Sequence, residues 1–301
     1  EIHSGDWSSD VCSSDLHSVN EHGYVHGYTE YESGRLSDSA NALAELNHAA
    51  TRYRGGHVLE AGCGVGAQTR LLLQRCPGTR LTSFDMSLPS LRRALAGVPA
   101  QARRRARFVN ADLFHVPFRP RTFDHVFICY VLEHLADPLR ALHTLAPLAK
   151  PAGTITAIEG DHGSAFFHPC TPEAWEAWLC LTEVQRRLGG DALIGRRLHG
   201  LFHAAGLEHV SVEPIVVYCD PSRPVLMDGF VDKTIVGMLR GIEAQVLGMG
   251  LMKTGDWRKG LADLLDIVHH PEGSFTYIFF RAVGTLPGQA EAPADAYKKE
   301  G

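Results

Sequence analysis

Residues 58–67 read VLEAGCGVGA, an apolar stretch of strand type that leads into a glycine-rich turn, with a helical segment beginning near Gln68. Glycine tolerates the left-handed backbone of such a turn, and the start of a helix offers free N–H groups to a ligand. The pattern therefore predicts a strand, a ligand-binding turn and a helix. Gly62, Gly64 and Ala67 also satisfy the fingerprint of dinucleotide-binding proteins. An NAD site and a turn that binds nothing are therefore both alternatives at this point.

Outward from this turn, short strand-type runs alternate with helical segments. The expected strands cover residues 57–61, 80–85, 106–110, 124–130 and 153–159. Because strands that alternate with helices form parallel sheets, the alternation predicts an α/β fold. Two further strand-type runs, at 209–218 and 274–283, follow later in the chain.

Three acidic residues stand at the ends of the first three expected strands. The carboxylate of Glu60 would repel the pyrophosphate of a dinucleotide but attract the ammonium and sulfonium groups of S-adenosylmethionine. Asp85 can accept hydrogen bonds from two ribose hydroxyls, and Met86 is suited to lie against adenine. Asp112 can accept from the adenine amino group while the Leu113 N–H faces a ring nitrogen. Together the three carboxylates favour S-adenosylmethionine over NAD.

Five segments carry a resemblance to a known family: VLEAGCGVGAQT, SFDMS, FVNADLFHVPF, TFDHVFICYVLEHLADP and LAKPAGTITAIEG. Over roughly residues 57–160 the chain resembles the class I S-adenosylmethionine-dependent methyltransferases, close to the type 11 group that includes ubiquinone and menaquinone biosynthesis enzymes. The resemblance implies a Rossmann-like seven-stranded sheet, mostly parallel with an antiparallel last strand, and S-adenosyl-L-methionine as cofactor. Pro151-Ala152-Gly153 departs from the family's usual Pro-Gly-Gly turn, which affects only the geometry of that turn.

The residues expected to bind this cofactor come from the turn, the strand ends and the N-terminal segment. They are Glu60, Gly62, Cys63, Gly64, Gly66, Asp85, Met86, Asp112, Leu113, Tyr130 and Tyr28. Tyr28, like Tyr24, lies where related enzymes fold an N-terminal segment over the cofactor. A surface turn whose rings only pack against the sheet is the alternative for both tyrosines.

Acceptor-side residues are expected after the fourth and fifth strands and in a helical cap, because ligands of open α/β sheets sit at the carboxyl ends of the strands. Those segments hold Tyr130, Glu133, His134, Glu159, Asp161, His162 and Ser164. His134 and His162 are the catalytic candidates, since imidazole accepts a proton near neutral pH, and a packing role is the alternative for both. Gly160 and Gly163 predict a shaped loop around His162. No residue spacing typical of a metal site is present in the sequence, so no metal is expected.

The expected organisation has four parts. Residues 1–16 are expected to be an artefact without defined structure, because DWSSDVCSSDL at positions 6–16 is a codon-by-codon translation of a sequencing adapter. Residues 17–54 would form a helical leader, residues 55–285 the methyltransferase domain and residues 286–301 a disordered tail. Helical insertions are expected at 163–205 and 220–273, the second being too long for a simple connection.

The composition limits the partners. A net charge of −5 gives no general attraction to nucleic acid or anionic lipid. No apolar stretch approaches the roughly 20 residues that span a bilayer, and the cysteines lack disulfide spacing, which predicts a cytoplasmic protein. The expected partner is a small methyl acceptor, with no nucleic acid and no membrane. Adaptable side chains such as Trp178 and Met227 suit an apolar acceptor, although ordinary helix packing is the alternative. An RNA or protein methyltransferase and a non-catalytic cofactor-binding subunit are the rival functions.

Overall fold

The computed structural model describes residues 43–287. A single sheet runs through them, formed by β1 (Gly56–Ala61), β2 (Thr79–Asp85), β3 (Ala106–Asn110), β4 (Phe123–Cys129), β5 (Ala149–His168), β6 (Glu208–Cys219) and β7 (Ser274–Thr285). The α-helices are α2 (Ala44–Asn47), α3 (Ala67–Arg75), α4 (Leu88–Gly97), α5 (Pro138–Leu145), α6 (Pro172–Arg187), α7 (Leu198–Ala204), α8 (Pro224–Leu226), α9 (Gly237–Gly241), α10 (Glu243–Gly248) and α11 (Thr254–Asp266). Short 3-10 helices are η1 (Ala100–Arg105), η2 (Leu132–His134), η3 (Ala146–Leu148) and η4 (Ile194–Arg197), and η5 (Met227–Val236) is a π-helix.

The strand order is β3-β2-β1-β4-β5-β7-β6, and β1 to β5 run parallel to one another. β7 runs antiparallel to both β5 and β6. The expected seven-stranded, mostly parallel sheet with an antiparallel last strand is thus confirmed. Between β1 and β4 the winding direction reverses, and in such sheets the ligand site lies at the carboxyl ends of the strands beside that reversal.

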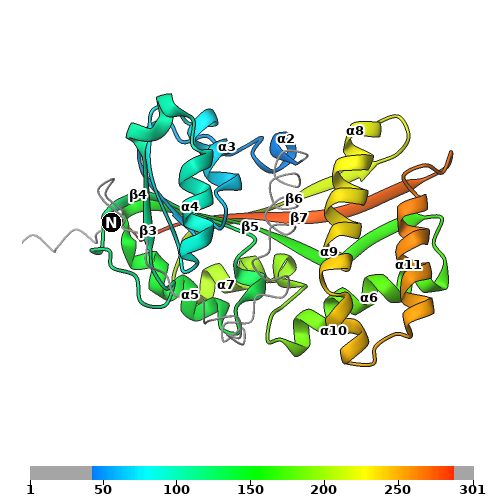
Figure 1. Ribbon diagram of the computed structural model, residues 1–301. Helices are drawn as coiled ribbons and strands as arrows, with labels where there is room; N and C mark the ends of the chain where they lie inside the picture. The colour runs from blue at the N-terminus through cyan, green and yellow to red at the C-terminus, as the bar shows by residue number, and fades with distance from the viewer. Residues whose placement is uncertain (1–42, 288–301) are drawn as a thin grey trace, which may run out of the picture.

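Helices cover both faces of the parallel part of the sheet (Figure 1). Leu72 of α3 and Leu91 of α4 pack in one buried cluster, and Leu142 of α5 and Phe202 of α7 pack in the other. Because both faces are covered, β1 is apolar almost throughout. Glu60 is the exception within the buried part of the strand, residues 58–61.

β5 is much longer than expected. It continues through the predicted loop around His162 and into residues 163–168, which were expected to be helical; both expectations are wrong. Neither Gly160 nor Gly163 adopts the positive φ that a glycine-shaped loop would use. The strand persists because β7 pairs with it as far as His168↔Ser274, with a register shift between Asp161 and Phe166. Gly160 serves close packing instead, since a Cβ there would lie 2.3 Å from the Tyr277 hydroxyl.

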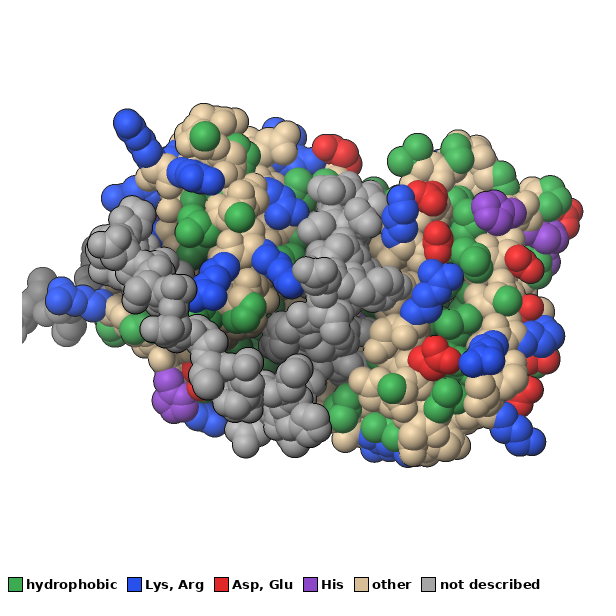
Figure 2. All heavy atoms as spheres, viewed as in Figure 1, with side chains coloured by type: hydrophobic (Ala, Val, Ile, Leu, Met, Phe, Trp, Pro, Cys, Tyr) green, Lys and Arg blue, Asp and Glu red, His purple; other side chains and the backbone are tan. Residues whose placement is uncertain are grey.

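The long ends of β5, β6 and β7 carry a helical cap formed by α6, η5, α9, α10 and α11 (Figure 1). Trp178 and Met227 are buried inside it, together with Phe230, Trp257 and Phe275. Packing therefore accounts for the first two, as the alternative reading proposed. Acidic and basic side chains are interspersed over its surface (Figure 2), as in the pair of Lys259 with Asp263.

Several expectations fall outside the described residues: the artefact at 1–16, most of the leader with Tyr24 and Tyr28, and all but the first two residues of the tail. Within residues 43–287, no helix has both the length and the apolar character needed to cross a bilayer.

Candidate active site

The glycine turn after β1 adopts the expected left-handed backbone. φ is +66° at Gly62, +50° at Gly64 and +76° at Gly66. A Cβ on Gly62 would lie 2.6 Å from a methyl group of Val131, and one on Gly66 would lie 2.7 Å from the Ala94 Cβ. At Gly64, apart from Cys63 and Val65 on either side, no atom of another described residue lies within 4 Å of the Cβ position. Packing thus requires the outer two glycines, whereas the middle one leaves room for a ligand beside the main chain.

Alanine substitutions should separate these two roles. Gly66→Ala is expected to destabilise the fold by about 2–4 kcal/mol, because left-handed strain adds to the clash with Ala94. Gly64→Ala should cost only about 1 kcal/mol in stability, from strain alone, but weaken cofactor binding at least 10-fold. Denaturant unfolding and calorimetry would measure the two effects. Equal stability losses in both variants would contradict the different roles.

Asp85, at the end of β2, is tied to this turn. Its Oδ2 accepts a hydrogen bond from the Gly64 N–H and its Oδ1 accepts one from the Ser87 N–H, both at 2.8 Å. Burial raises the pKa of its carboxyl group, against the effect of these backbone donors. Each oxygen keeps a second lone pair for a ribose hydroxyl, so the expected role is compatible with the geometry. Met86 follows with an exposed fraction of 42%, which leaves an apolar surface for an adenine ring.

Glu60 lies beneath the turn, with only 2% of its surface exposed. Its Oε2 accepts hydrogen bonds from the hydroxyls of Thr69 and Ser83, both at 2.6 Å. Burial raises the pKa of this carboxyl group from 4.5 to about 7. A cation bound beside the turn would therefore meet a carboxyl group that is poised to ionise.

The third acid differs in position from the expectation. β3 ends at Asn110, and Asp112 lies in the following turn, where its Oδ1 accepts from the Phe114 N–H at 2.9 Å. Its Oδ2 contacts His115 Nδ1 at 2.8 Å, and its side chain is 42% exposed. Leu113 beside it is nearly buried. The adenine contacts of Asp112 and Leu113 stay predictions.

Cys63 and Tyr130 are two further residues that the sequence assigns to the cofactor. Cys63 is buried in the turn, and its N–H donates to the Phe84 carbonyl at 3.0 Å. Tyr130, directly after β4, holds a left-handed φ of +58° although it is not glycine. Its hydroxyl is bonded by the Asn47 side-chain amide. Such strain costs about 1–3 kcal/mol and is concentrated at functional sites, which supports a special role for Tyr130.

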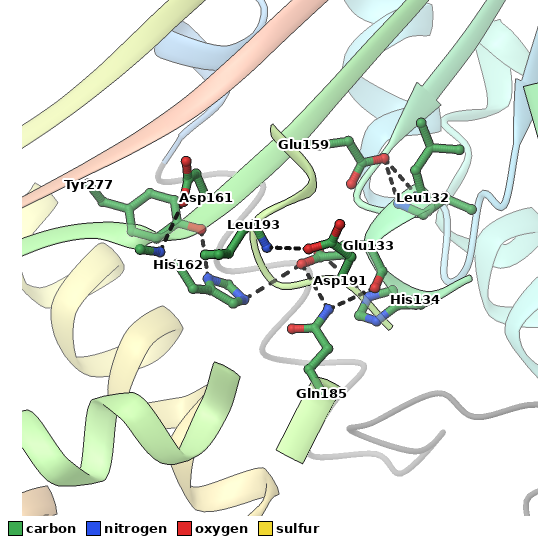
Figure 3. Close-up of polar contacts among 12 residues, drawn as sticks. Leu132, Glu133, His134, Glu159, Asp161, His162, Gln185, Asp191, Leu193 and Tyr277 are labelled. Carbon is green, nitrogen blue, oxygen red and sulfur yellow. Dashed lines mark hydrogen bonds and ion pairs between the residues drawn. The ribbon is translucent and has the colours of Figure 1, made fainter. Parts of the chain in front are cut away.

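His134 and His162 converge on Glu133 (Figure 3). His162 Nε2 lies 3.6 Å from Glu133 Oε2, and His134 Nε2 lies 3.6 Å from Glu133 Oε1. His162 Nδ1 also contacts the Tyr277 hydroxyl at 2.7 Å, and Gln185 Nε2 donates to Glu133 Oε2 at 3.3 Å. Both imidazoles are largely buried. Their shared contact with Glu133 places the two catalytic candidates in one polar cluster. In the part of the chain that the structure describes, no three ligand-type side chains are grouped for a metal ion.

Residues 59–157 match the family described as "Methyltransferase domain". They form a class I methyltransferase domain. The resemblance to S-adenosylmethionine-dependent methyltransferases is thereby confirmed, as is the expectation of an enzyme, and NAD-dependent oxidoreduction is set aside. This methyltransferase domain runs from Leu59 in β1 to Ala157, in the first half of β5, and includes the glycine turn and all three acids. The cap, β6 and β7 lie outside the match.

Individual relatives agree with this assignment. The chain is 26% identical over 195 residues to a malonyl-[acyl-carrier protein] O-methyltransferase of Pseudescherichia vulneris, which covers 62% of this chain and 71% of that protein. It is 38% identical over 128 residues to a trans-aconitate 2-methyltransferase of Acidovorax ebreus, covering 40% of this chain and 44% of that protein. The structure of a Haemonchus contortus phosphoethanolamine N-methyltransferase in complex with S-adenosyl-L-methionine shares the fold, with a TM-score of 0.50 and 16% identity. That likeness covers 82% of this chain and 52% of the other. This chain thus spans less than half of the second relative's length.

Part of the cluster around Glu133 escaped sequence reasoning. Tyr277 comes from β7 and Gln185 from α6, far along the chain from His162 and Glu133. Neither belongs to a motif, and only the pairing of β7 with β5 brings Tyr277 to His162. A local pattern therefore contains no signal that would have found them.

Proposed function

We propose that this domain binds S-adenosyl-L-methionine at the carboxyl ends of β1, β2 and β3 and transfers its methyl group to an O, N or C nucleophile of a small, apolar molecule. The observation that carries the proposal is the glycine turn, open at Gly64 and flanked by the carboxyl groups of Glu60 and Asp85. Asp85 would hold the ribose, and Glu60 would pair with the cationic part of the cofactor. Met86, Asp112 and Leu113 would hold adenine.

The cofactor supplies a methyl group on a sulfonium, so the protein mainly has to align the nucleophile and exclude water. The cap over β5 and β7 would perform the second task. His162 is the stronger candidate for accepting a proton from the nucleophile, because Glu133 would stabilise the imidazolium that forms when neutral His162 takes the proton, and the Tyr277 hydroxyl contacts its other ring nitrogen. His134 would act on the same carboxyl group from the side of η2, as a second candidate.

We further propose that the reaction takes place in the cytoplasm and that the methyl acceptor is a small molecule. The six cysteines among the described residues are free, which suits a reducing compartment. The net charge of −5 disfavours a nucleic-acid acceptor.

The proposal is tested by incubating the purified protein with methyl-labelled S-adenosylmethionine and a metabolite extract. Label is expected in a small organic product. His162→Ala should bind the cofactor normally by calorimetry but transfer label at least 100-fold more slowly, since a positioned base contributes about 10²–10⁴-fold. Label found only in RNA or polypeptide would favour the macromolecular alternative. Cofactor binding without any labelled product would favour a non-catalytic subunit.

A further inference from the structure

Glu159 is a buried carboxyl group with one oxygen that has no partner. It lies in β5 directly after Ile158, which pairs with the last residue of β4, Cys129. Its side chain is fully buried, with 0% of its surface exposed. Oε1 accepts hydrogen bonds from the N–H groups of Val131 at 3.1 Å and Leu132 at 2.9 Å. Oε2 makes no hydrogen bond to any described residue.

The surroundings of Glu159 favour its protonated form. Burial raises the pKa of the carboxyl group well above its usual value, and the neighbouring Glu133 raises it further. The backbone donors at Oε1 act in the opposite direction but are outweighed. Because Oε1 already accepts two N–H groups, the proton belongs on Oε2, which then becomes a hydrogen-bond donor.

A buried donor that lacks a partner costs about 1–3 kcal/mol, so the fold carries this cost unless another molecule supplies an acceptor. The position of Glu159 fits such a partner. It stands where β4 ends beside β5, at the edge of the sheet where substrates bind. In Figure 3 one oxygen faces the Leu132 backbone and the other points away, toward the side where Glu133 and His162 lie.

Charges around the site select among acceptor chemistries. Asp161 directly precedes His162 in β5, and Glu133 Oε2 lies 3.6 Å from His162 Nε2. The Arg196 guanidinium donates two N–H groups to the Asp161 carboxylate, at 2.6 and 2.8 Å. A carboxylate entering here would meet the Glu133 carboxylate while the nearby cation is already neutralised, which disfavours anionic acceptors.

We propose that Glu159 recognises the methyl acceptor through a hydrogen bond from Oε2 to an uncharged oxygen, and that the site selects alcohols, phenols or ketones over carboxylic acids. This inference rests on the proposed methyl transfer and defines the acceptor class for the same site. It sets this chain apart from the relative that is named for trans-aconitate, a carboxylic acid.

The protonation state can be measured without knowing the acceptor. Infrared difference spectra between the wild type and Glu159→Gln at pH 7 should show the carbonyl stretch of a protonated carboxylic acid, present in the wild type and lost in the variant. A carboxylate signal in its place would overturn the inference. Glutamine is nearly isosteric, and its oxygen can accept the same two N–H groups, so the variant should fold.

Acceptor selection is tested with methyl-labelled S-adenosylmethionine and a metabolite extract separated at pH 7 by anion exchange and then cation exchange. We expect label in the fraction retained by neither column, and none on added trans-aconitate. Glu159→Gln, which can still donate from its amide nitrogen, should transfer label at least about 10-fold faster than Glu159→Met, which cannot. Calorimetric binding of S-adenosylmethionine to each variant checks that the cofactor half is intact.

Label in a retained fraction or on trans-aconitate would overturn the inference alone, as would equal transfer by the two variants. Absence of cofactor binding by the wild type would overturn the proposed function itself. The two failures are therefore distinguishable.

Discussion

Glu60→Gln is expected to stabilise the protein without cofactor and, at the same time, to weaken cofactor binding. The pKa of Glu60 rises from 4.5 to about 7 on folding, so the folded state holds this proton more tightly than the unfolded state. The contribution of Glu60 to stability is therefore fully present below pH 4.5 and is lost as the pH rises through 7. At about 1.4 kcal/mol per pKa unit, the buried carboxylate costs about 3 kcal/mol at pH 8. Glutamine removes this cost and can still accept from Thr69 and Ser83.

The cofactor should respond in the opposite direction. If Glu60 pairs with the ammonium and sulfonium groups as proposed, removing its carboxylate is expected to lower affinity about 100-fold, corresponding to nearly 3 kcal/mol. In the wild type, affinity should rise as the pH increases from 6 to 8, because the bound cation favours ionised Glu60. Denaturant unfolding at pH 5 and pH 8, with calorimetry of S-adenosylmethionine, measures both effects. Glu208→Gln makes the same chemical change on an exposed edge strand and should produce neither. A Glu60→Gln variant that binds the cofactor as tightly as the wild type would remove Glu60 from the cofactor site.

Asp85→Ala is expected to cause the largest loss of cofactor affinity, about 100- to 1,000-fold. Two charge-assisted hydrogen bonds to the ribose are worth about 1.5–3 kcal/mol each. The same substitution removes the acceptors for the Gly64 and Ser87 N–H groups, so the glycine turn also loses its anchor to β2. Calorimetry of S-adenosylmethionine and S-adenosylhomocysteine should show the loss for both compounds, because they share the ribose.

Asp124→Ala is the matched control for this substitution. Asp124 also accepts a backbone N–H, from His57 at 2.7 Å, and pairs with Lys150, but it lies at the opposite end of the sheet. Its removal should reduce stability. Cofactor affinity should stay within about 2-fold of the wild type, because the partly exposed Asp124–Lys150 pair is distant from the glycine turn. If both aspartate variants lost affinity equally, the effect of Asp85 would be one of general stability and its ribose role would be wrong.

Sequence patterns predicted the backbone of the glycine turn well and the segment around His162 poorly. The glycine turn, Glu60 and Asp85 lie within about thirty residues, where strand, turn and helix preferences act locally. The loop expected around His162 was wrong, because β7, more than a hundred residues later, pairs with β5 and extends it to His168. No preference of Gly160 or Gly163 could have revealed that partner. The positive φ of Tyr130 was likewise invisible, since an L residue takes that conformation only when its surroundings impose it.

The sequence by itself determined the fold class, the glycine turn and the acids at its edge, because these depend on backbone freedom and hydrophobic periodicity within short segments. Only the tertiary structure decided which groups are buried together: Glu133 with two histidines, Tyr277 against His162, and Glu159 with one oxygen bonded and one without a partner. The physical reason is that burial, and the change in pKa and hydrogen bonding that it causes, arises from contacts between segments that are distant along the chain.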